Sequence, residues 1–598
     1  MISFLRIIFA ACLLLQYSLF AQEVLPPVQP WSGSSLELVA DSSNPWITPS
    51  EKTKLTETPN YEETMQWIHR LVDASPLLRM EVVGVSEQQR EIVMVIASSD
   101  RRTAAADLKA SSKPLLLAQA GIHAGEIDGK DAGMMLLRDI AFGGKEGLLD
   151  KVNFLFVPIL NVDGHERVTA YSRVNQRGPK QMGWRTNAQN LNLNRDYSKL
   201  ETAGVQSVVQ VINNYDPDLY VDLHVTDGAD YQYDITYGWA GESGFSLYSA
   251  QWLDTVFKPA MNTALSSQGH IPGPLMFAFN DRDFSEGNTE FAFSPRFSET
   301  YGDLRHTPSI LVENHSLKPY DQRVLGTYVF LEEALQLMAQ YGKSLQKKRI
   351  KDQAVRLDSV TLAYELSPSL EDSMTLLGIK SRMKPSQITN GEYIAWTGTP
   401  VTEQIVVRRM NKPAKVVKMP QAYWVPAEWQ AVIGKLLDHG VQMEVLTESR
   451  SVQVSSYVLD EFTMSSVPFE GHVRCGDFSH HRVTSDKTYR KGSVRVTTDQ
   501  PLGALVALLL EPDSPDSFLQ WGYFHSIFSR TEYIEEYVIE PMAEQMLAED
   551  EELARRFAEK KAKDKEFAES PRAIYAWFYA QSPYYDEAWK VYPVAREE

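Results

Sequence analysis

A histidine and a carboxylate lie three residues apart where one apolar run gives way to another. His123 and Glu126 belong to the stretch from Leu115 to Asp131, which begins as a strand-like sequence and continues as a helix-like one. Imidazole nitrogen and carboxylate oxygen are ligand types that Zn2+ accepts in catalytic sites, where three protein groups leave a fourth position open. The best third ligand is His224, which closes another apolar strand-like run downstream. This layout is typical of a zinc hydrolase.

Strand-like and helix-like segments alternate from Tyr61 to about Gly342. The strand-like runs are Ile92 to Ala97, Leu115 to Gln119, Asn153 to Ile159, Leu219 to His224 and Ser309 to Glu313. Helical periodicity fits Asp131 to Phe142 and Glu201 to Asn214. Such alternation predicts an α/β sheet with helices on both faces.

Further polar residues follow the strands of this predicted sheet. The run from Ser309 ends in Glu313, which would therefore lie with the candidate ligands at the carboxyl edge of the sheet, where open α/β sheets bind ligands. A polar loop between the first and third ligands carries Arg185, Asn194 and Arg195. Guanidinium groups suit carboxylates and developing oxyanions, because their rigid fork of donors stays charged at any working pH.

The length of the chain, 598 residues, exceeds what one hydrophobic core can hold, since single cores stop growing at roughly 250 to 300 residues. We expect a signal peptide over residues 1–21, an irregular arm over 22–59, an α/β catalytic domain over 60–345 and an accessory region over 359–598. The accessory region reads as β-rich at first, with a strand expected over Ala504 to Leu510. The stretch from Thr531 to Ala580 is helical by composition and is expected to pack back on the body.

The N-terminus predicts a location outside the cytoplasm. Arg6, an apolar core and the small residue Ala21 before polar sequence are typical of a secretory signal, so we expect a secreted or periplasmic protein. No later segment has the roughly 20 apolar residues of a membrane span. A formal net charge of -19 argues against nucleic acid as a partner, because phosphate binding needs basic patches.

A second group of possible metal ligands lies in the accessory region. It consists of His472, Cys475, His480 and His481. A structural zinc site normally uses four ligands in paired spacings, and adjacent histidines do not easily face one ion, so a solvated loop is favoured here. Once the signal segment is removed, Cys475 is the only cysteine, which excludes an intrachain disulfide.

Five motifs, in order, resemble those of the zinc carboxypeptidase family. They are HAGE at 123–126, WR at 184–185, NLNRD at 192–196, DLH at 222–224 and VENHSLKPY at 312–320. The resemblance covers about residues 60 to 340, and the region beyond is similar to the C-terminal extension of some secreted bacterial members. It implies an α/β fold with a mixed sheet of about eight strands and one Zn2+ per chain, followed here by a β-rich accessory region and C-terminal helices.

The resemblance also implies a role for each candidate residue. The matches are His123, Glu126 and His224 as metal ligands, Glu313 as general acid/base, Arg185 as the group that polarises the scissile carbonyl, and Asn194 with Arg195 as the pair that binds the substrate's terminal carboxylate. Tyr301 is the nearest candidate for the family's tyrosine that closes over substrate. The animal digestive enzymes orient a zinc histidine with an aspartate where this chain has Asn192, whose amide can still accept a hydrogen bond from the ring. Asp128 and Asp222 border the ligands and either orient them or cap turns.

These matches predict a secreted zinc carboxypeptidase that hydrolyses the C-terminal peptide bond. A zinc-activated water would attack, with Glu313 as general acid/base, and the partner would be a peptide with a free C-terminal carboxylate. One alternative is a zinc amidohydrolase acting on cell-wall peptides or N-acyl amino acids, since the same metal site serves several amide substrates. Another is a non-catalytic binding protein on the same fold, although such chains tend to lose a ligand or the glutamate.

Overall fold

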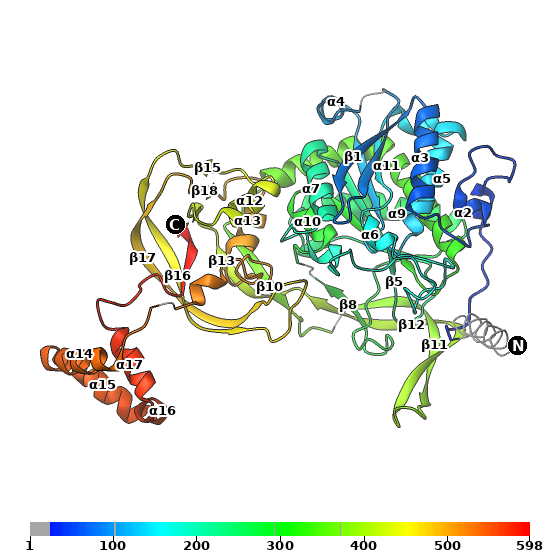
Figure 1. The fold of residues 1–598 in the computed structure, drawn as a ribbon. Helices are drawn as coiled ribbons and strands as arrows, with labels where there is room; N and C mark the ends of the chain where they lie inside the picture. The colour runs from blue at the N-terminus through cyan, green and yellow to red at the C-terminus, as the bar shows by residue number, and fades with distance from the viewer. Residues whose placement is uncertain (1–23, 101–102, 292–293, 371, 531) are drawn as a thin grey trace, which may run out of the picture.

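The computed structural model describes residues 24–100, 103–291, 294–370, 372–530 and 532–598 (Figure 1). The expected signal peptide over residues 1–21 lies outside the described residues. No helix in these described ranges combines the length and the apolar character that a membrane crossing requires.

The N-terminal half of the chain is built on a mixed sheet of eight strands (Figure 1). In spatial order the strands are β1 (Leu78–Val85), β2 (Glu91–Ala97), β4 (Asn153–Val157), β3 (Leu115–Ala120), β5 (Leu219–Thr226), β9 (Ser309–His315), β6 (Ile235–Gly238) and β7 (Pro272–Gly273). The four central strands, from β4 to β9, run parallel, whereas β2 and β6 are antiparallel to the neighbours that flank this block. The sheet confirms the predicted fold class, and the five predicted strands all lie in it.

Helices cover both faces of this sheet. They are α2 (Pro49–Lys52), α3 (Tyr61–Ala74), α4 (Ala105–Ala110), α5 (Asp128–Phe142), α6 (Val162–His165), α7 (Ala203–Tyr215), α8 (Leu247–Trp252), α9 (Lys258–Ser267), α10 (Ser298–Leu304) and α11 (Tyr320–Ala354). One apolar core packs α3, α5, α9 and α11 on one face, and a second core packs α7 on the other. Strand β3 is buried along its whole length, as expected of a parallel strand covered on both sides.

A glycine brings one helix close to the sheet. A Cβ at Gly133 of α5 would lie 2.1 Å from the Phe156 ring, so only glycine allows this close approach of helix and strand. Helix α11 is 35 residues long, and its C-terminal part, from Lys343 to Ala354, is rich in charged residues.

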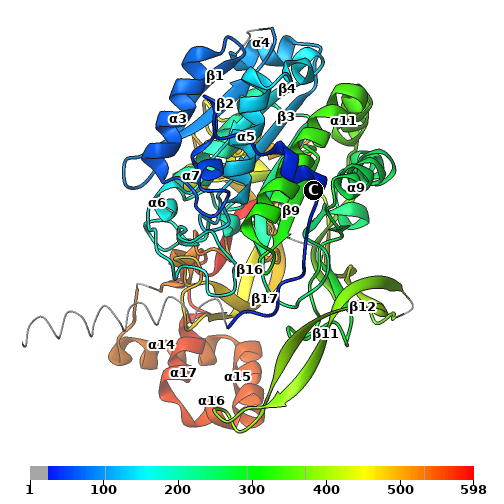
Figure 2. The ribbon, with the colours of Figure 1, turned by 90° about the vertical axis from the view of Figure 1, so that its right-hand side faces the viewer.

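The C-terminal half contains three further groups of strands (Figures 1 and 2). Strand β10 (Ser359–Glu365) pairs with β13 (Lys412–Lys418), while β11 (Ser373–Pro385) and β12 (Glu392–Met410) form a long ribbon that is joined by β8 (Asn288–Phe291) of the N-terminal half. A six-stranded sheet follows in the order β15 (Glu444–Val445), β18 (Val494–Thr497), β14 (Ala422–Val425), β19 (Val591–Glu597), β16 (Arg450–Met464) and β17 (Cys475–Tyr489).

The two halves share one hydrophobic core. Val208 of α7, Leu436 of α12 (Gln430–Asp438) and Leu509 of α13 (Gly503–Leu510) belong to the same buried cluster. The expectation of a strand over Ala504 to Leu510 was wrong, because α13 occupies this run. An unbroken apolar run carries no twofold alternation, and its leucine and alanine residues are strong helix formers, all but Ala504 buried here.

The predicted helical stretch near the C-terminus projects from the body instead of packing back on it (Figure 1). Helices α14 (Glu536–Glu549), α15 (Glu551–Lys563), α16 (Lys565–Glu569) and α17 (Pro571–Tyr579) form this unit. They enclose a small core of their own around Ile539 and Phe578. The chain then returns to the six-stranded sheet as β19, between β14 and β16.

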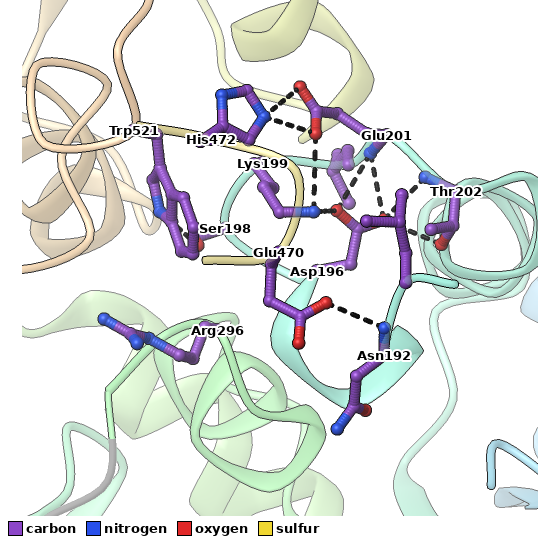
Figure 3. Close-up of polar contacts among 12 residues, drawn as sticks. Asn192, Asp196, Ser198, Lys199, Glu201, Thr202, Arg296, Glu470, His472 and Trp521 are labelled. Atoms are coloured by element: carbon purple, nitrogen blue, oxygen red, sulfur yellow. Dashed lines mark hydrogen bonds and ion pairs between the residues drawn. The ribbon is translucent and has the colours of Figure 1, made fainter. Parts of the chain in front are cut away.

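Polar contacts supplement the shared core where the accessory region meets the loop before α7 (Figure 3). His472 Nε2 lies 2.8 Å from Glu201 Oε2, and the Tyr523 hydroxyl donates to Glu201 Oε1 at 2.7 Å. Although partial burial opposes the effect, the hydrogen bonds from His472 and Tyr523 lower the pKa of Glu201 to about 2. The ionised carboxylate therefore helps to hold the two halves together.

Replacing Glu201 by glutamine is predicted to remove more stability at neutral pH than in acid. The folded-state pKa of Glu201 lies below its ordinary value of 4.5, so the charged form stabilises the fold above about pH 5, and this contribution is lost as the pH falls toward about 2. We expect Glu201→Gln to cost roughly 1 kcal/mol at neutral pH, because the pair is partly exposed, and about half as much near pH 3. Urea-induced unfolding at both pH values measures the difference.

The exposed ion pair between Lys180 and Glu57 provides a control. Glu57→Gln should leave the unfolding midpoint unchanged at both pH values. An equal loss in Glu201→Gln at neutral and acid pH would contradict the assigned role of the Glu201 charge.

Candidate active site

The three candidate ligands meet at the carboxyl edge of the sheet. His123 and Glu126 lie in the loop between β3 and α5, and His224 lies near the end of β5. Glu126 Oε2 is 3.1 Å from His123 Nδ1 and 3.0 Å from His224 Nδ1. The ligand atoms all lie within 4.8 Å of one another and the residues are buried. In the part of the chain that the structure describes, no second group of three such side chains converges in this way.

The Nε2 atom of each histidine contacts an oxygen acceptor on the side away from Glu126. His123 Nε2 lies 2.9 Å from Asn192 Oδ1, and His224 Nε2 lies 2.7 Å from Asp222 Oδ2. An oxygen acceptor at Nε2 favours a ring proton there, so Nδ1, on the side of Glu126, is the nitrogen available to a metal ion. The donor types, their convergence and these outer partners all fit a zinc ion. Asn192 thus contacts the ring that it was expected to orient.

Two of the three groups, His123 and Glu126, are in the protonation state that binds a metal ion. Burial lowers the pKa of His123 to about 4, so this ring is neutral near pH 7, the form in which imidazole binds metals. Although burial opposes both effects, Asp222 raises the pKa of His224, and His123 with Arg173 lowers the pKa of Glu126. Glu126 is therefore ionised.

A cavity of about 470 Å3 opens beside these three residues. Glu313 lines it from β9, where it lies next to His224 across the parallel strand pair. Glu313 Oε2 is buried and has no hydrogen-bond partner among the described residues. Burial and the nearby Glu126 charge raise the pKa of Glu313. A carboxyl oxygen without a partner at the wall of a cavity is free to exchange a proton with a molecule bound there.

Two arginines contact Glu126, one of the three candidate ligands. Arg173 Nη1 lies 2.8 Å from Glu126 Oε1, and Arg185 Nη1 lies 3.1 Å from the same oxygen. Both side chains line the cavity. Arg185 was predicted, whereas Arg173 was missed, because a single basic residue in a long loop carries no sequence signal.

Asn194 and Arg195 lie together on another wall of the cavity. They belong to the short 3-10 helix η3 (Leu193–Arg195). Asn194 Oδ1 accepts a hydrogen bond from the backbone of Ser298 at 3.0 Å, and the Arg195 guanidinium lies 4.4 Å from the centre of the Phe297 ring. These contacts hold the predicted carboxylate-binding pair against α10.

Tyr301 lies away from this cavity. Its side chain is fully buried, and its hydroxyl is 2.9 Å from His439 Nδ1 of the accessory region. The structure therefore does not bring Tyr301 together with the other predicted site residues. The aromatic rings of Phe277, Phe291 and Phe297 line the cavity instead.

Glu299, at the start of α10, also lines the cavity and was not predicted. Its Oε1 atom is buried and lacks a hydrogen-bond partner within the described part of the chain, and burial raises the pKa of this carboxyl to about 7. The sequence offered no sign of this role, since a glutamate in the first turn of a helix is common.

Other residues that bordered the predicted site have structural partners. Asp128 pairs with Arg323 at 2.8 Å, and His315 Nε2 lies 3.0 Å from Asp230. The histidines of the accessory region contact three different carboxylates, so they do not share an ion: His472 with Glu201, His480 with Asp513 and His481 with Asp460. Cys475 is buried as a free thiol.

The fold and this site define an α/β metallohydrolase. Residues 64–268 match the model of the zinc carboxypeptidase family, so the chain contains a zinc carboxypeptidase domain. The matched segment contains the three candidate ligands, while Glu313 lies beyond it. The chain is therefore a metallocarboxypeptidase.

Similar proteins extend the comparison. Carboxypeptidase 2 of Trichophyton tonsurans is 22% identical over 513 residues, which cover 82% of this chain and 89% of that protein. Carboxypeptidase 2 of Trichophyton rubrum is 21% identical over 488 residues, or 78% and 84% of the two chains. Among solved structures, carboxypeptidase A from Helicoverpa armigera matches with a TM-score of 0.36 and 17% identity, covering 48% of this chain and 75% of that one. The two fungal similarities reach beyond the α/β domain into the C-terminal region.

Replacing Asp222 by asparagine is predicted to weaken zinc binding about tenfold, because the amide accepts from the His224 ring but no longer increases its basicity. Competition with a chromophoric chelator measures the zinc dissociation constant directly. Asp230→Asn is the matched control, since Asp230 is also a buried partner of a histidine but His315 is not a candidate ligand. Equal weakening in the two variants would contradict a specific role for Asp222.

Proposed function

We propose that this protein is a zinc carboxypeptidase that removes single residues from the free carboxyl ends of peptides. The observation that carries the proposal is the convergence of His123, Glu126 and His224 beside a cavity that also holds Glu313 and Arg195. We further propose a catalytic domain over residues 60–345 and an accessory region over 359–598. The signal-like sequence of residues 1–21 supports a secreted or periplasmic location.

His123, Glu126 and His224 would hold the zinc ion. When bound there, zinc supplies a Lewis acid for the scissile carbonyl and lowers the pKa of water toward about 7. Asn192 and Asp222 keep the two rings oriented toward the ion through their Nε2 atoms. Because all three ligands are buried, the surrounding protein limits access of bulk water to the site.

Glu313 is the proposed general acid/base. Its buried Oε2 takes a proton from the attacking water and passes it to the nitrogen of the departing residue. Arg185, with Arg173 beside it, stabilises the negative charge that develops on the carbonyl oxygen, because both guanidinium groups stay charged.

Asn194 and Arg195 are proposed to bind the terminal carboxylate of the substrate. A guanidinium can donate two parallel hydrogen bonds to a carboxylate, which an amidated peptide end cannot accept in the same way. We propose that the side chain of the released residue lies near Glu299. A cationic or hydrogen-bond-donating side chain would give the unpartnered Oε1 of Glu299 a partner, which favours such residues at the end of the substrate.

Glu313→Gln is predicted to lower kcat by about 100- to 10,000-fold, because the amide cannot exchange the proton, while one zinc ion per chain is retained. Mass spectrometry of a mixed peptide library gives the turnover, and elemental analysis gives the zinc content. The library contains free and amidated carboxyl ends, including murein peptides. Single residues should be lost only from free ends by the wild-type chain.

Other results of this experiment point to the alternatives. Bound zinc without trimming of any peptide would favour an amidohydrolase that acts on a different substrate. A chain that binds no zinc would be a binding protein on the same fold. Loss of zinc from Glu313→Gln would contradict the assignment of Glu313 to proton transfer alone.

Arg195→Met is predicted to raise KM for peptides with a free carboxyl end by about 100-fold, since a charge-assisted pair is lost from a partly buried position. Slow cleavage of amidated peptides, where detectable, should not change further. Arg282→Met serves as the control, because Arg282 is exposed and does not line the cavity. A fall in kcat with unchanged KM would argue against a role for Arg195 in binding the terminal carboxylate.

A further inference from the structure

A tight turn of the accessory region lies against the loop that carries Asn192 (Figure 3). Phe469 and His472 exchange two backbone hydrogen bonds, of 2.8 and 3.1 Å, across this turn. Glu470 stands at its tip with φ of 49°, a left-handed conformation that is uncommon for residues other than glycine. Glu470 Oε2 accepts a hydrogen bond from the backbone N–H of Asn192 at 2.7 Å. A residue far away in the sequence therefore contacts the loop behind the candidate metal site.

Asn192 links this contact to the site. Its side-chain Oδ1 lies 2.9 Å from His123 Nε2 and also accepts from the backbone N–H of Asn194 at 3.0 Å. The same residue thus orients one candidate zinc ligand and caps the short helix that presents Asn194 and Arg195. Because Glu470 holds the backbone of Asn192, a continuous series of hydrogen bonds runs from the accessory region to both parts of the site.

The turn itself is firmly anchored. The Phe469 ring stacks on Trp521 with 6.0 Å between ring centroids, and the Arg296 guanidinium lies 5.7 Å from the Phe469 ring. His472 pairs with Glu201 at 2.8 Å on the other side of the turn. These contacts involve neither the candidate ligands nor the cavity. They keep the turn in place, so the position of Glu470 does not depend on its bond to Asn192 alone.

We propose that Glu470 is a positioning residue of the active site, through which the accessory region holds Asn192 and so sets the orientation of His123 and of the Asn194–Arg195 pair. The inference rests on the proposed function only in assigning roles to those residues. Without the carboxylate, the N–H of the largely buried Asn192 would lose its partner, and the loop would no longer be held at one conformation. The accessory region would then be part of the active site and not a separate module.

The test compares four variants of the full chain: Glu470→Ala, Glu470→Asp, Glu470→Gln and His472→Gln. Glu470→Ala is expected to weaken zinc binding about tenfold, because loss of a hydrogen-bond partner behind a metal ligand lowers metal affinity by about 10- to 100-fold. It should also raise KM for peptides with a free carboxyl end severalfold. Glu470→Asp keeps the charge but shortens the reach, so it should resemble the alanine variant. Glu470→Gln retains an oxygen that accepts from Asn192 and should restore most of both values.

His472→Gln is the matched control, because it alters the same interface without touching the bond to Asn192. It should lower the unfolding midpoint while leaving zinc affinity and KM near the wild-type values. Zinc competition and unfolding are measured on every variant, so a variant that fails to fold is recognised. In that case, the zinc affinities of Glu470→Asp and Glu470→Gln still test the hydrogen bond to Asn192.

Equal zinc affinity in Glu470→Ala and wild type, or an equal loss in Glu470→Ala and His472→Gln, would overturn the proposal. Failure of Glu470→Gln to rescue would do the same. The zinc measurement does not depend on peptide hydrolysis. If the wild-type chain cleaved no peptide, the proposed function would fail. The zinc affinities of the Glu470 variants would still show whether Glu470 positions His123 through Asn192.

Discussion

The buried carboxylate of Glu126 is the constraint on which the rest of the site depends. Its Oε2 atom contacts both histidine rings and accepts from the backbone of Val225, and its Oε1 atom faces Arg173 and Arg185. A buried charge is costly unless it is paired and hydrogen-bonded, so the groups around Glu126 must converge for the fold to form. They come from separate loops and from β5. Compensation of one buried carboxylate therefore brings together the parts of the candidate metal site.

The parallel centre of the sheet makes this convergence possible. Parallel strands end at the same edge, and β3, β5 and β9 place His123, His224 and Glu313 beside one another there. Because both faces of the sheet are buried, the strands have little freedom to shift register. The accessory region packs on the α7 face through a shared apolar core and reaches the loop behind His123. The residues that position the candidate site therefore include parts of the accessory region as well as the sheet.

Prediction from the sequence worked where the physical signal is local. Five apolar strands were recognisable because parallel strands buried on both faces are continuous apolar runs, and the candidate ligands were singled out because they lie at the ends of such runs. Local reasoning was wrong for Ala504 to Leu510, where an apolar run without alternation fits either a helix or a strand. Placement of Tyr301 depended on a spacing that the chain does not keep, and the residue lies in the core beside His439.

Hydrophobic patterning and short motifs are encoded along the chain, so they sufficed to predict the fold class, the resemblance to the zinc carboxypeptidase family and the candidate ligands. Which distant groups face the site depends on how the chain folds in three dimensions. Arg173 and Glu299 line the cavity, and Glu470 holds Asn192, although no local pattern marks any of them. Arg173 compensates a buried charge, Glu470 satisfies a backbone N–H, and Glu299 is a buried carboxyl at the cavity wall; each of these roles depends on which segments meet in space.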